Sequence, residues 1–284
     1  MTTVPQDYLE RNPLMTDADY SFLKGVLQHE DAPAWNYQVG DRLELRDLDQ
    51  VDGFRTALRE QRGPWSAEPP EWLLARVEEM RLTVPAVADR FGDGVVTAES
   101  FKSAEPVTRD VLAAHPELLV PLDADLDRLI VYDSSGSTGH SMVVPHHPAD
   151  NGATCAMIEF ALERSGVVPD FQPGSMACVN INIQAETVVF ATVLAVWNHG
   201  GLAKVNLKPS AWPSPESRAR FLTELSPEII TGEPRAFAEL LALSGELGPG
   251  FKPKGLLSTA TLLSPALRDE LGRRFKCPVI DWYS

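Results

Sequence analysis

The sequence predicts an α/β protein with mixed, largely parallel sheets and flanking helices, preceded by a mostly helical N-terminal region. Hydrophobic residues make up 44% and charged residues 23% of the 284 positions, which is an ordinary globular composition. From Trp72 to Phe91 apolar residues recur at helical spacing, whereas beyond Leu129 short β-rich runs alternate with helical ones. Such alternation implies right-handed crossovers and a parallel sheet.

The N-terminal part is polar, and it ends in the Pro-rich stretch GPWSAEPPEW over residues 63–72. Because such stretches are typical of linkers, we expect a helical or irregular extension over residues 1–71 and one larger domain over residues 72–284. Inside that domain, apolar residues at three- and four-residue spacing predict a helix over 72–91 and further helical turns over 108–115.

The second half is expected to form the sheet. Strands are predicted over residues 129–133, 142–144, 177–183, 202–207, 228–231, 255–259 and 278–283, and helices over 150–164, 214–225, 235–243 and 264–275. The stretch AETVVFATVLAVWNHGG, residues 185–201, is apolar nearly all round and predicts a helix buried against the sheet. His199 would complement the dipole at the end of that helix.

The charge excludes several classes of partner. The formal net charge is −15, so the protein is expected to repel nucleic-acid backbones and anionic lipid surfaces. The three cysteines have no regular spacing, the N-terminus is unlike a signal peptide, and no apolar run reaches the roughly 20 residues that span a bilayer. Together with the charge, these features predict a cytoplasmic protein that binds neither nucleic acid nor membrane.

The densest chemical signal is a loop between two predicted strands. It carries four hydroxyl side chains and two glycines, namely Ser134, Ser135, Gly136, Ser137, Thr138 and Gly139. Hydroxyls and close backbone N–H groups suit phosphate oxygens. The loop has no Walker A lysine, and its glycines are too close for a nucleophile elbow. The same composition is typical of a solvated turn, so both readings stand at this point.

The loop resembles the phosphate-binding signature of adenylate-forming acyl-CoA synthetases, and its surroundings are most similar to the phenylacetate-CoA ligase branch. Four further stretches resemble that branch in the same order: WLLARVEEMRLTVPAVADRFGDG, EPVTRDVLAAHPELLVP, LSPEIITGEPRAFAELLAL and GLLSTATLLSPALRDELGRRFKCPVIDWYS. The resemblance covers about residues 72–284 and implies the fold of the N-terminal domain of such an enzyme.

The resemblance also implies a site. The loop over 134–139 would hold the β and γ phosphates of ATP. The adenine would be bordered by Ser258, Thr259, Ala260 and Tyr283, and the carboxylate substrate by Asn182, Thr231 and Gly232. Mg²⁺ and coenzyme A, or the phosphopantetheine of a carrier protein, would complete the set of cofactors.

This chain departs from the family pattern at three places. His140, Ser141 and Met142 stand where the family usually places Pro and then Lys or Thr. The acidic residue usual near the adenine contact is missing at 259–261. Only Tyr283 and Ser284 remain of the aromatic-Gly-x-Thr-Glu motif. The resemblance therefore predicts a truncated chain whose catalytic Glu and Lys lie beyond Ser284 and which is inactive alone.

The predicted function is ATP-dependent activation of a small carboxylic acid, most often aromatic in this family, to acyl-AMP, followed by transfer to CoA or a carrier thiol. An acyl carrier protein would then be a partner, and the sequence is compatible with a homodimer. The alternative is a noncatalytic nucleotide- or acyl-binding module without the lysine-bearing domain. We expect no metal site at His146, His147 and Cys155, because no fourth ligand is spaced to close one.

Overall fold

The computed structural model describes residues 3–60, 67–134 and 142–282. The chain divides into two compact units, one formed by Met1–Arg59 with Asn151–Ser284 and the other by Glu60–Asp150. The first 59 residues therefore belong to the same unit as the C-terminal half.

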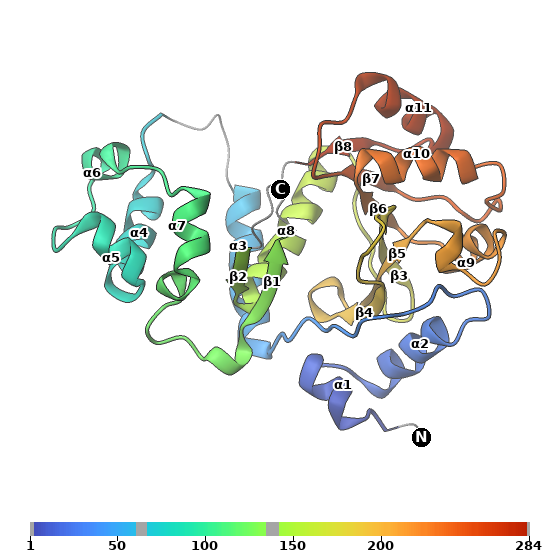
Figure 1. Cartoon of the computed structure of the whole chain (residues 1–284), viewed down its shortest axis with the longest axis horizontal. Coiled ribbons are helices and arrows are strands. Elements are labelled where there is room, and N and C mark those ends of the chain that lie inside the picture. The colour runs from blue at the N-terminus through green and yellow to red at the C-terminus, as the bar shows by residue number, and fades with distance from the viewer. Residues whose placement is uncertain (1–2, 61–66, 135–141, 283–284) are drawn as a thin grey trace. The chain divides into compact units, whose positions relative to one another are not determined.

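The larger unit is built on a six-stranded sheet with the order β4-β5-β3-β6-β7-β8 (Figure 1). Its strands are β3 (Met176–Asn182), β4 (Phe190–Leu194), β5 (Gly200–Asn206), β6 (Ile229–Gly232), β7 (Gly255–Ser258) and β8 (Val279–Asp281). β4 runs antiparallel to β5, and all other neighbours are parallel. The predicted mixed, largely parallel α/β fold is confirmed.

Helices cover both faces of this sheet, and side-chain alternation along the strands separates two hydrophobic clusters. Val179 and Ile181 of β3 belong to the cluster that includes residues of α2 (Asp17–Leu27), α9 (Ser217–Leu225), α10 (Pro234–Leu243) and α11 (Pro265–Phe275). Cys178 belongs to the cluster that includes residues of α3 (Leu45–Glu60) and α8 (Pro148–Arg164). We call these the α10 face and the α8 face of the sheet.

The stretch 185–201 is not the predicted helix. It forms β4, a 3₁₀ turn at Ala195–Trp197 and the first residues of β5. The run TVVFATV at 187–193 is rich in β-branched residues, which favour strands, and a continuous apolar run does not by itself separate a buried helix from a buried strand. Asn198 and His199 take positive φ values of 49° and 61° in the turn into β5, so His199 caps no helix.

The N-terminal residues form α1 (Gln6–Arg11) and α2. Thr16 begins α2 with a capping box: its hydroxyl accepts a hydrogen bond from the backbone N–H of Asp19, and the Asp19 carboxylate accepts one from the backbone N–H of Thr16. Leu23 and Val26 of α2 are buried in the cluster on the α10 face.

The smaller unit contains α4 (Glu71–Thr83), α5 (Pro85–Phe91), α6 (Ala98–Ser103), α7 (Arg109–Ala114) and 3₁₀ helices at Pro116–Leu119 and Leu126–Arg128. β1 (Ile130–Ser134) and β2 (Met142–His146) then pair antiparallel. The predicted helix over 72–91 is divided at Val84, because the residue before a proline is held in an extended conformation. The strands predicted on either side of the hydroxyl-rich loop are confirmed.

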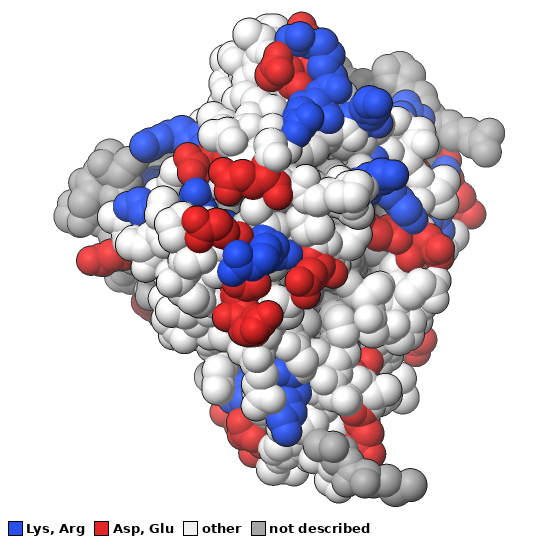
Figure 2. Space-filling model, turned by 90° about the vertical axis from the view of Figure 1, so that its right-hand side faces the viewer, with Lys and Arg blue, Asp and Glu red and all other residues white. Residues whose placement is uncertain are grey.

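Charged side chains of both signs are interspersed on the face drawn in Figure 2. Ion pairs in the described residues include Arg220 with Asp31 and Arg273 with Glu270. In the described ranges, no helix combines the length and the apolar character needed to cross a membrane.

Candidate functional site

The carboxyl ends of the five parallel strands bring together residues that are far apart in the sequence. Strand pairing places Asn182 beside Asn206, Gly232 beside Ser258, and Ser258 beside Asp281. In α/β sheets this edge is where ligands bind. Six of the predicted site residues, 182, 231–232 and 258–260, therefore lie at one edge of the sheet.

One group of polar residues lies on the α8 face. Asn180 is paired in register with Lys204 of β5 and with Thr231 of β6. The Asn180 side-chain amide donates a hydrogen bond of 2.8 Å to the Thr231 hydroxyl, and the Cys178 sulfur lies 3.9 Å from that same oxygen. Lys204, Asn180 and Thr231 thus lie side by side on three neighbouring strands.

Asn182 lies one step further along β3, toward the edge. Its amide nitrogen donates to the Val205 carbonyl at 2.9 Å, while its buried Oδ1 has no hydrogen-bond partner among the described residues. Asn206, by contrast, uses both ends of its side chain, donating to Gln184 O at 2.8 Å and accepting from Lys208 N at 3.0 Å. A buried acceptor without a partner is costly, so Asn182 favours a ligand or water that donates a hydrogen bond.

Lys204 is a site residue that our sequence analysis missed. It is half-buried, burial lowers its pKa, and the described part of the chain shows no ion pair for it. A desolvated ammonium without a counterion favours a bound anion. The signal was visible in LAKVNL, residues 202–207, where one lysine stands in a mostly apolar predicted strand.

Ser258 lies on the opposite face from Asn182 and Thr231, because its strand neighbours Leu256 and Leu257 belong to the α10-face and α8-face clusters respectively. Its side chain is fully buried, and its hydroxyl has no partner within the described ranges. The structure therefore brings Ser258 to the same edge as Asn182 but not to the same face.

The chain turns sharply after β7. Thr259 N donates to the Gly232 carbonyl at 3.0 Å, and Ala260 adopts a φ of 71°. Gly232 permits the close approach of β6 and β3, since a Cβ there would lie 2.6 Å from the Ile181 carbonyl oxygen. These contacts fix the backbone of the predicted adenine border.

The rest of the predicted site cannot be placed in the same way. Ser134 ends β1 in the smaller unit, where its backbone pairs with Met142. Ser135, Gly136, Ser137, Thr138, Gly139 and Tyr283 lie outside the described residues.

The side chains at the carboxyl ends of the strands are suited to binding a ligand. Burial raises the pKa of the Cys178 thiol to about 12, so this sulfur is not a thiolate nucleophile at neutral pH. Among the residues that the structure describes, no three His, Cys, Asp or Glu side chains gather as a metal site would require. The amides, the hydroxyls and Lys204 suit an anionic ligand rich in hydrogen-bond acceptors.

Comparison with known proteins returned no matching family model and no matching curated protein. The solved structures that the chain is similar to include an open conformation of 2-hydroxyisobutyryl-CoA ligase in complex with 2-HIB-AMP and CoA, at 16% identity and a TM-score of 0.45 over 82% of this chain and 52% of the ligase. A second structure of that ligase has a TM-score of 0.43 at 19% identity, over 82% of this chain and 48% of the ligase. The chain thus spans about half the length of these ligase chains.

Two other similar structures are VinN with L-aspartate and the anthranilate CoA ligase AuaEII with anthranoyl-AMP. VinN has 15% identity and a TM-score of 0.39, over 94% of this chain and 74% of VinN. AuaEII has 14% identity and a TM-score of 0.37, over 96% of this chain and 60% of AuaEII.

Proposed function

We propose that this chain binds ATP and a small carboxylic acid as part of an enzyme that forms an acyl-AMP and passes the acyl group to CoA or to a carrier thiol. One observation carries the proposal: near the carboxyl ends of the parallel strands, the half-buried Lys204 has no ion pair among the described residues and is paired in register with Asn180. The Asn180 amide in turn donates to the hydroxyl of Thr231. The hydroxyl-rich loop over 134–139 adds donors suited to phosphate.

The roles we assign follow from where the groups lie. Lys204 would attract the substrate carboxylate, and Asn182 and Thr231 would orient it, with Gly232 leaving room beside them. Ser258, Thr259 and Ala260, with Tyr283, would border adenine. Ser134, Ser135, Gly136, Ser137, Thr138 and Gly139 would hold the β and γ phosphates.

The reaction proposed for the whole enzyme is a displacement at phosphorus. A carboxylate oxygen attacks the α-phosphorus of ATP, the bond to the bridging oxygen breaks, and pyrophosphate leaves. Charge that develops on the phosphoryl oxygens would be stabilised by hydroxyl and backbone N–H donors already in position. An aromatic acid is the substrate class that we propose to test first.

Mg²⁺ would neutralise charge on the phosphates, but the described residues offer no acidic cluster to hold it. We therefore assign it no protein ligand among them. CoA, phosphopantetheine and a carrier-protein surface are likewise assigned no residues.

A noncatalytic nucleotide- or acyl-binding module is the second candidate. The observation that favours it is the character of the edge, which supplies amides, a lysine and hydroxyls, while its one thiol is protonated by burial. The two candidates share the binding site and differ in turnover.

Thermal unfolding in the presence of ATP and Mg²⁺, with and without a panel of aryl and alkyl carboxylic acids, tests the shared binding site. Ligand at about 100 times its Kd is expected to stabilise the chain by about 2.7 kcal/mol. Lys204→Gln should abolish the extra stabilisation by the acid and keep that by ATP, whereas Lys24→Gln, a change at an exposed lysine of α2, should alter neither. Absence of stabilisation by ATP and by every acid would overturn both candidates.

Pyrophosphate exchange into ATP separates the two candidates. The enzyme proposal expects acid-dependent exchange by this chain within the whole enzyme. Binding of ATP and acid without exchange in that enzyme would leave the noncatalytic module as the function.

A further inference from the structure

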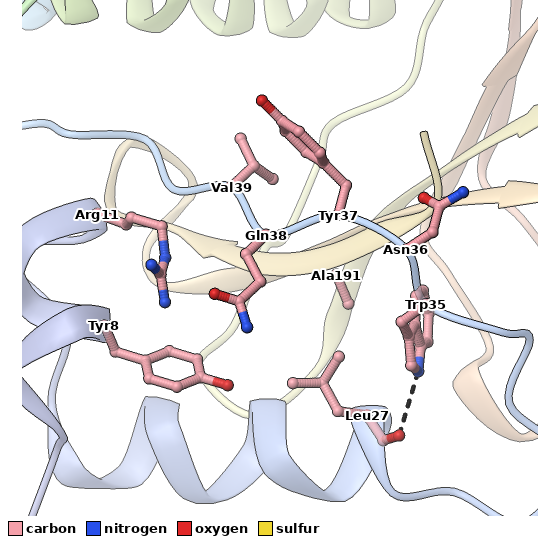
Figure 3. Close-up of a pocket in the computed structure, with 9 residues that line it drawn as sticks. All are labelled: Tyr8, Arg11, Leu27, Trp35, Asn36, Tyr37, Gln38, Val39 and Ala191. Atoms are coloured by element: carbon pink, nitrogen blue, oxygen red, sulfur yellow. Dashed lines mark hydrogen bonds between the residues drawn. The ribbon is translucent and has the colours of Figure 1, made fainter. Parts of the chain in front are cut away.

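A cavity of about 480 Å³ lies beside β4, which is the outermost strand on one side of the six-stranded sheet. Figure 3 shows its walls: α1, the end of α2 at Leu27, the segment 35–39 and Ala191 of β4. Ala191 belongs to the α10-face cluster, so the cavity lies on the face opposite Lys204. Its volume is within the range of small-molecule sites.

The segment 35–39 is fastened to the sheet. Asn36 exchanges hydrogen bonds with Val189, as its backbone N–H donates to the Val189 carbonyl at 3.1 Å and its side-chain oxygen accepts from the Val189 N–H at 2.7 Å. Its side-chain nitrogen also donates to the Thr187 carbonyl at 3.0 Å. This wall is therefore already in place before a ligand enters, which lowers the entropic cost of binding.

The other walls are held just as firmly. The Trp35 indole nitrogen donates to the Leu27 carbonyl at 3.1 Å, and the Trp35 ring packs edge-on against Phe221 with centroids 6.1 Å apart. Gly40 passes so close to α1 that a Cβ there would lie 2.0 Å from the Arg11 carbonyl oxygen. An indole face and the end of α1 are thus fixed on two sides of the cavity.

The cation of the cavity is Arg11, whose guanidinium lies among the lining side chains, above the Tyr8 ring (Figure 3). One of its nitrogens donates to Asp7 at 2.9 Å, and the Asp7 side chain is 56% exposed. An ion pair so exposed contributes at most about 1 kcal/mol, so an incoming anion can share or replace it.

Two neutral polar groups join this cation. Figure 3 shows the Gln38 amide and the Tyr8 hydroxyl on the same side of the segment 35–39 as Arg11, whereas Tyr37 points away. Neither group has a hydrogen-bond partner among the described residues. No carboxylate is among the residues that line the cavity, although the protein carries a net charge of −15. The lining favours an anionic group at the Arg11 end and a flat apolar group against Trp35, Leu27 and Ala191.

We propose that this cavity is a second binding site, distinct from the carboxyl edge of the sheet, that takes a small aromatic carboxylate. The guanidinium of Arg11 pairs with the carboxylate, Gln38 and Tyr8 complete its hydrogen bonds, and the aromatic ring lies against the Trp35 indole and the Leu27 side chain. The acid bound here is a ligand and undergoes no reaction, because the lining holds no nucleophile beside a base.

Fluorine NMR of the chain labelled with 5-fluorotryptophan tests the proposal, with the Trp35 signal assigned by its loss in Trp35→Phe. Titration with indole-3-acetate is expected to shift the Trp35 signal to saturation, and the neutral indole-3-acetamide is expected to bind at least about tenfold more weakly. Arg11→Gln should remove this preference for the acid, and Arg11→Lys should restore part of it. Arg273→Gln, which breaks an exposed ion pair on α11, should change nothing.

The same titration separates this cavity from the carboxyl edge. In Lys204→Gln the Trp35 shift should persist with unchanged affinity, since Lys204 lies on the other face of the sheet. The proposal is overturned by an unmoved Trp35 signal, by equal affinity for acid and amide, or by loss of the shift in Lys204→Gln with no effect of Arg11→Gln. Unchanged signals of the other tryptophans in Arg11→Gln show that the variant is folded.

Discussion

The imidazole of His199 and the carboxylate of Asp19 are joined at 2.8 Å, Nδ1 to Oδ2, although 180 positions separate the two residues in the sequence. Asp19 is 2% exposed, and the same oxygen accepts hydrogen bonds from the backbone and the hydroxyl of Thr16. One carboxylate thus closes the first turn of α2 and holds the turn that leads into β5. The N-terminal helices are tied to the sheet at this point.

His199→Ala is therefore expected to lower the free energy of unfolding by about 1–3 kcal/mol, because it removes one partner of a buried carboxylate. Urea unfolding monitored by circular dichroism measures the change. Arg273→Ala, which breaks an exposed ion pair with Glu270, is the control and should cost less than about 1 kcal/mol. Equal losses in the two variants would contradict the importance of the His199–Asp19 contact.

A second tie joins α3 to α8. Arg55 binds both carboxylate oxygens of Glu159, at 2.8 and 2.9 Å, with the two side chains only 18% and 12% exposed. Arg55 also pairs with Asp52, whose side chain is 69% exposed. Glu159→Gln should lower stability by about 1–3 kcal/mol, because the mostly buried guanidinium loses its buried charged partner and keeps only the exposed one.

The next turn of the same two helices provides a matched control. Arg59 pairs with Glu163, but there the side chains are 51% and 28% exposed, so Glu163→Gln should cost less than about 1 kcal/mol. Differential urea unfolding of the two variants decides the matter. A larger loss at Glu163 than at Glu159 would show that burial does not govern these pairs.

Two buried aspartates are expected to respond to pH in opposite directions. Hydrogen bonds from Arg220 and then Ser217 lower the pKa of Asp31 from 3.8 to about 2. Burial raises the pKa of Asp41 from 3.8 to about 6, even though Ala195 N and Leu43 N donate to its carboxylate. Asp31 thus stabilises the fold above pH 4 and loses this contribution as the pH falls toward 2. The contribution of Asp41 is present below pH 4 and is lost as the pH rises toward 6.

Unfolding free energies measured between pH 2 and 7 test these signs. Asp31→Asn should reduce the loss of unfolding free energy as the pH falls below 4. Asp41→Asn should remove the loss of unfolding free energy as the pH rises from 4 to 6. A wild-type profile with the same slope as Asp41→Asn over that interval would contradict the assignment for Asp41.

The alternating half of the chain was predictable because its signals are local. The runs EIIT, RAFAELLAL and GLLST each show their apolar pattern and their boundaries within a few residues. The elements β6, α10 and β7 lie where these runs predict them. The run at 187–193 was misread because strand and helix both bury a continuous apolar segment. The segment forms a strand because β4 pairs with β5, which is a tertiary contact that the local sequence does not show.

The site was predictable only in part, for a similar reason. Asn182, Thr231 and Gly232 lie at or next to the ends of predicted strands, so their position at the carboxyl edge could be read from the sequence. That Ser258 points to the other face depends on strand register, and that Lys204 lies beside Asn180 depends on the pairing of β3 with β5. Contacts such as His199 with Asp19 have no local signal at all.

Gly232→Ala tests how tightly the edge is packed. A Cβ at Gly232 would lie 2.6 Å from the Ile181 carbonyl oxygen, so β6 and β3 must move apart. We expect a loss of about 1–3 kcal/mol in stability and weaker ligand binding at the edge. Gly245→Ala, where an added Cβ meets nothing within 4 Å, is the control and should be close to neutral. An unchanged free energy of unfolding in Gly232→Ala would show that β6 and β3 accommodate a Cβ at this position.

A crystal structure of the chain grown with an aroyl-sulfamoyl-adenosine, a stable analogue of an aryl-AMP, tests the central claim most directly. The account predicts the adenine beside residues 258–260 and the aroyl group within hydrogen-bonding reach of Lys204 and Asn182. Electron density for the analogue only in the cavity beside β4, or none at saturating concentration, would contradict it.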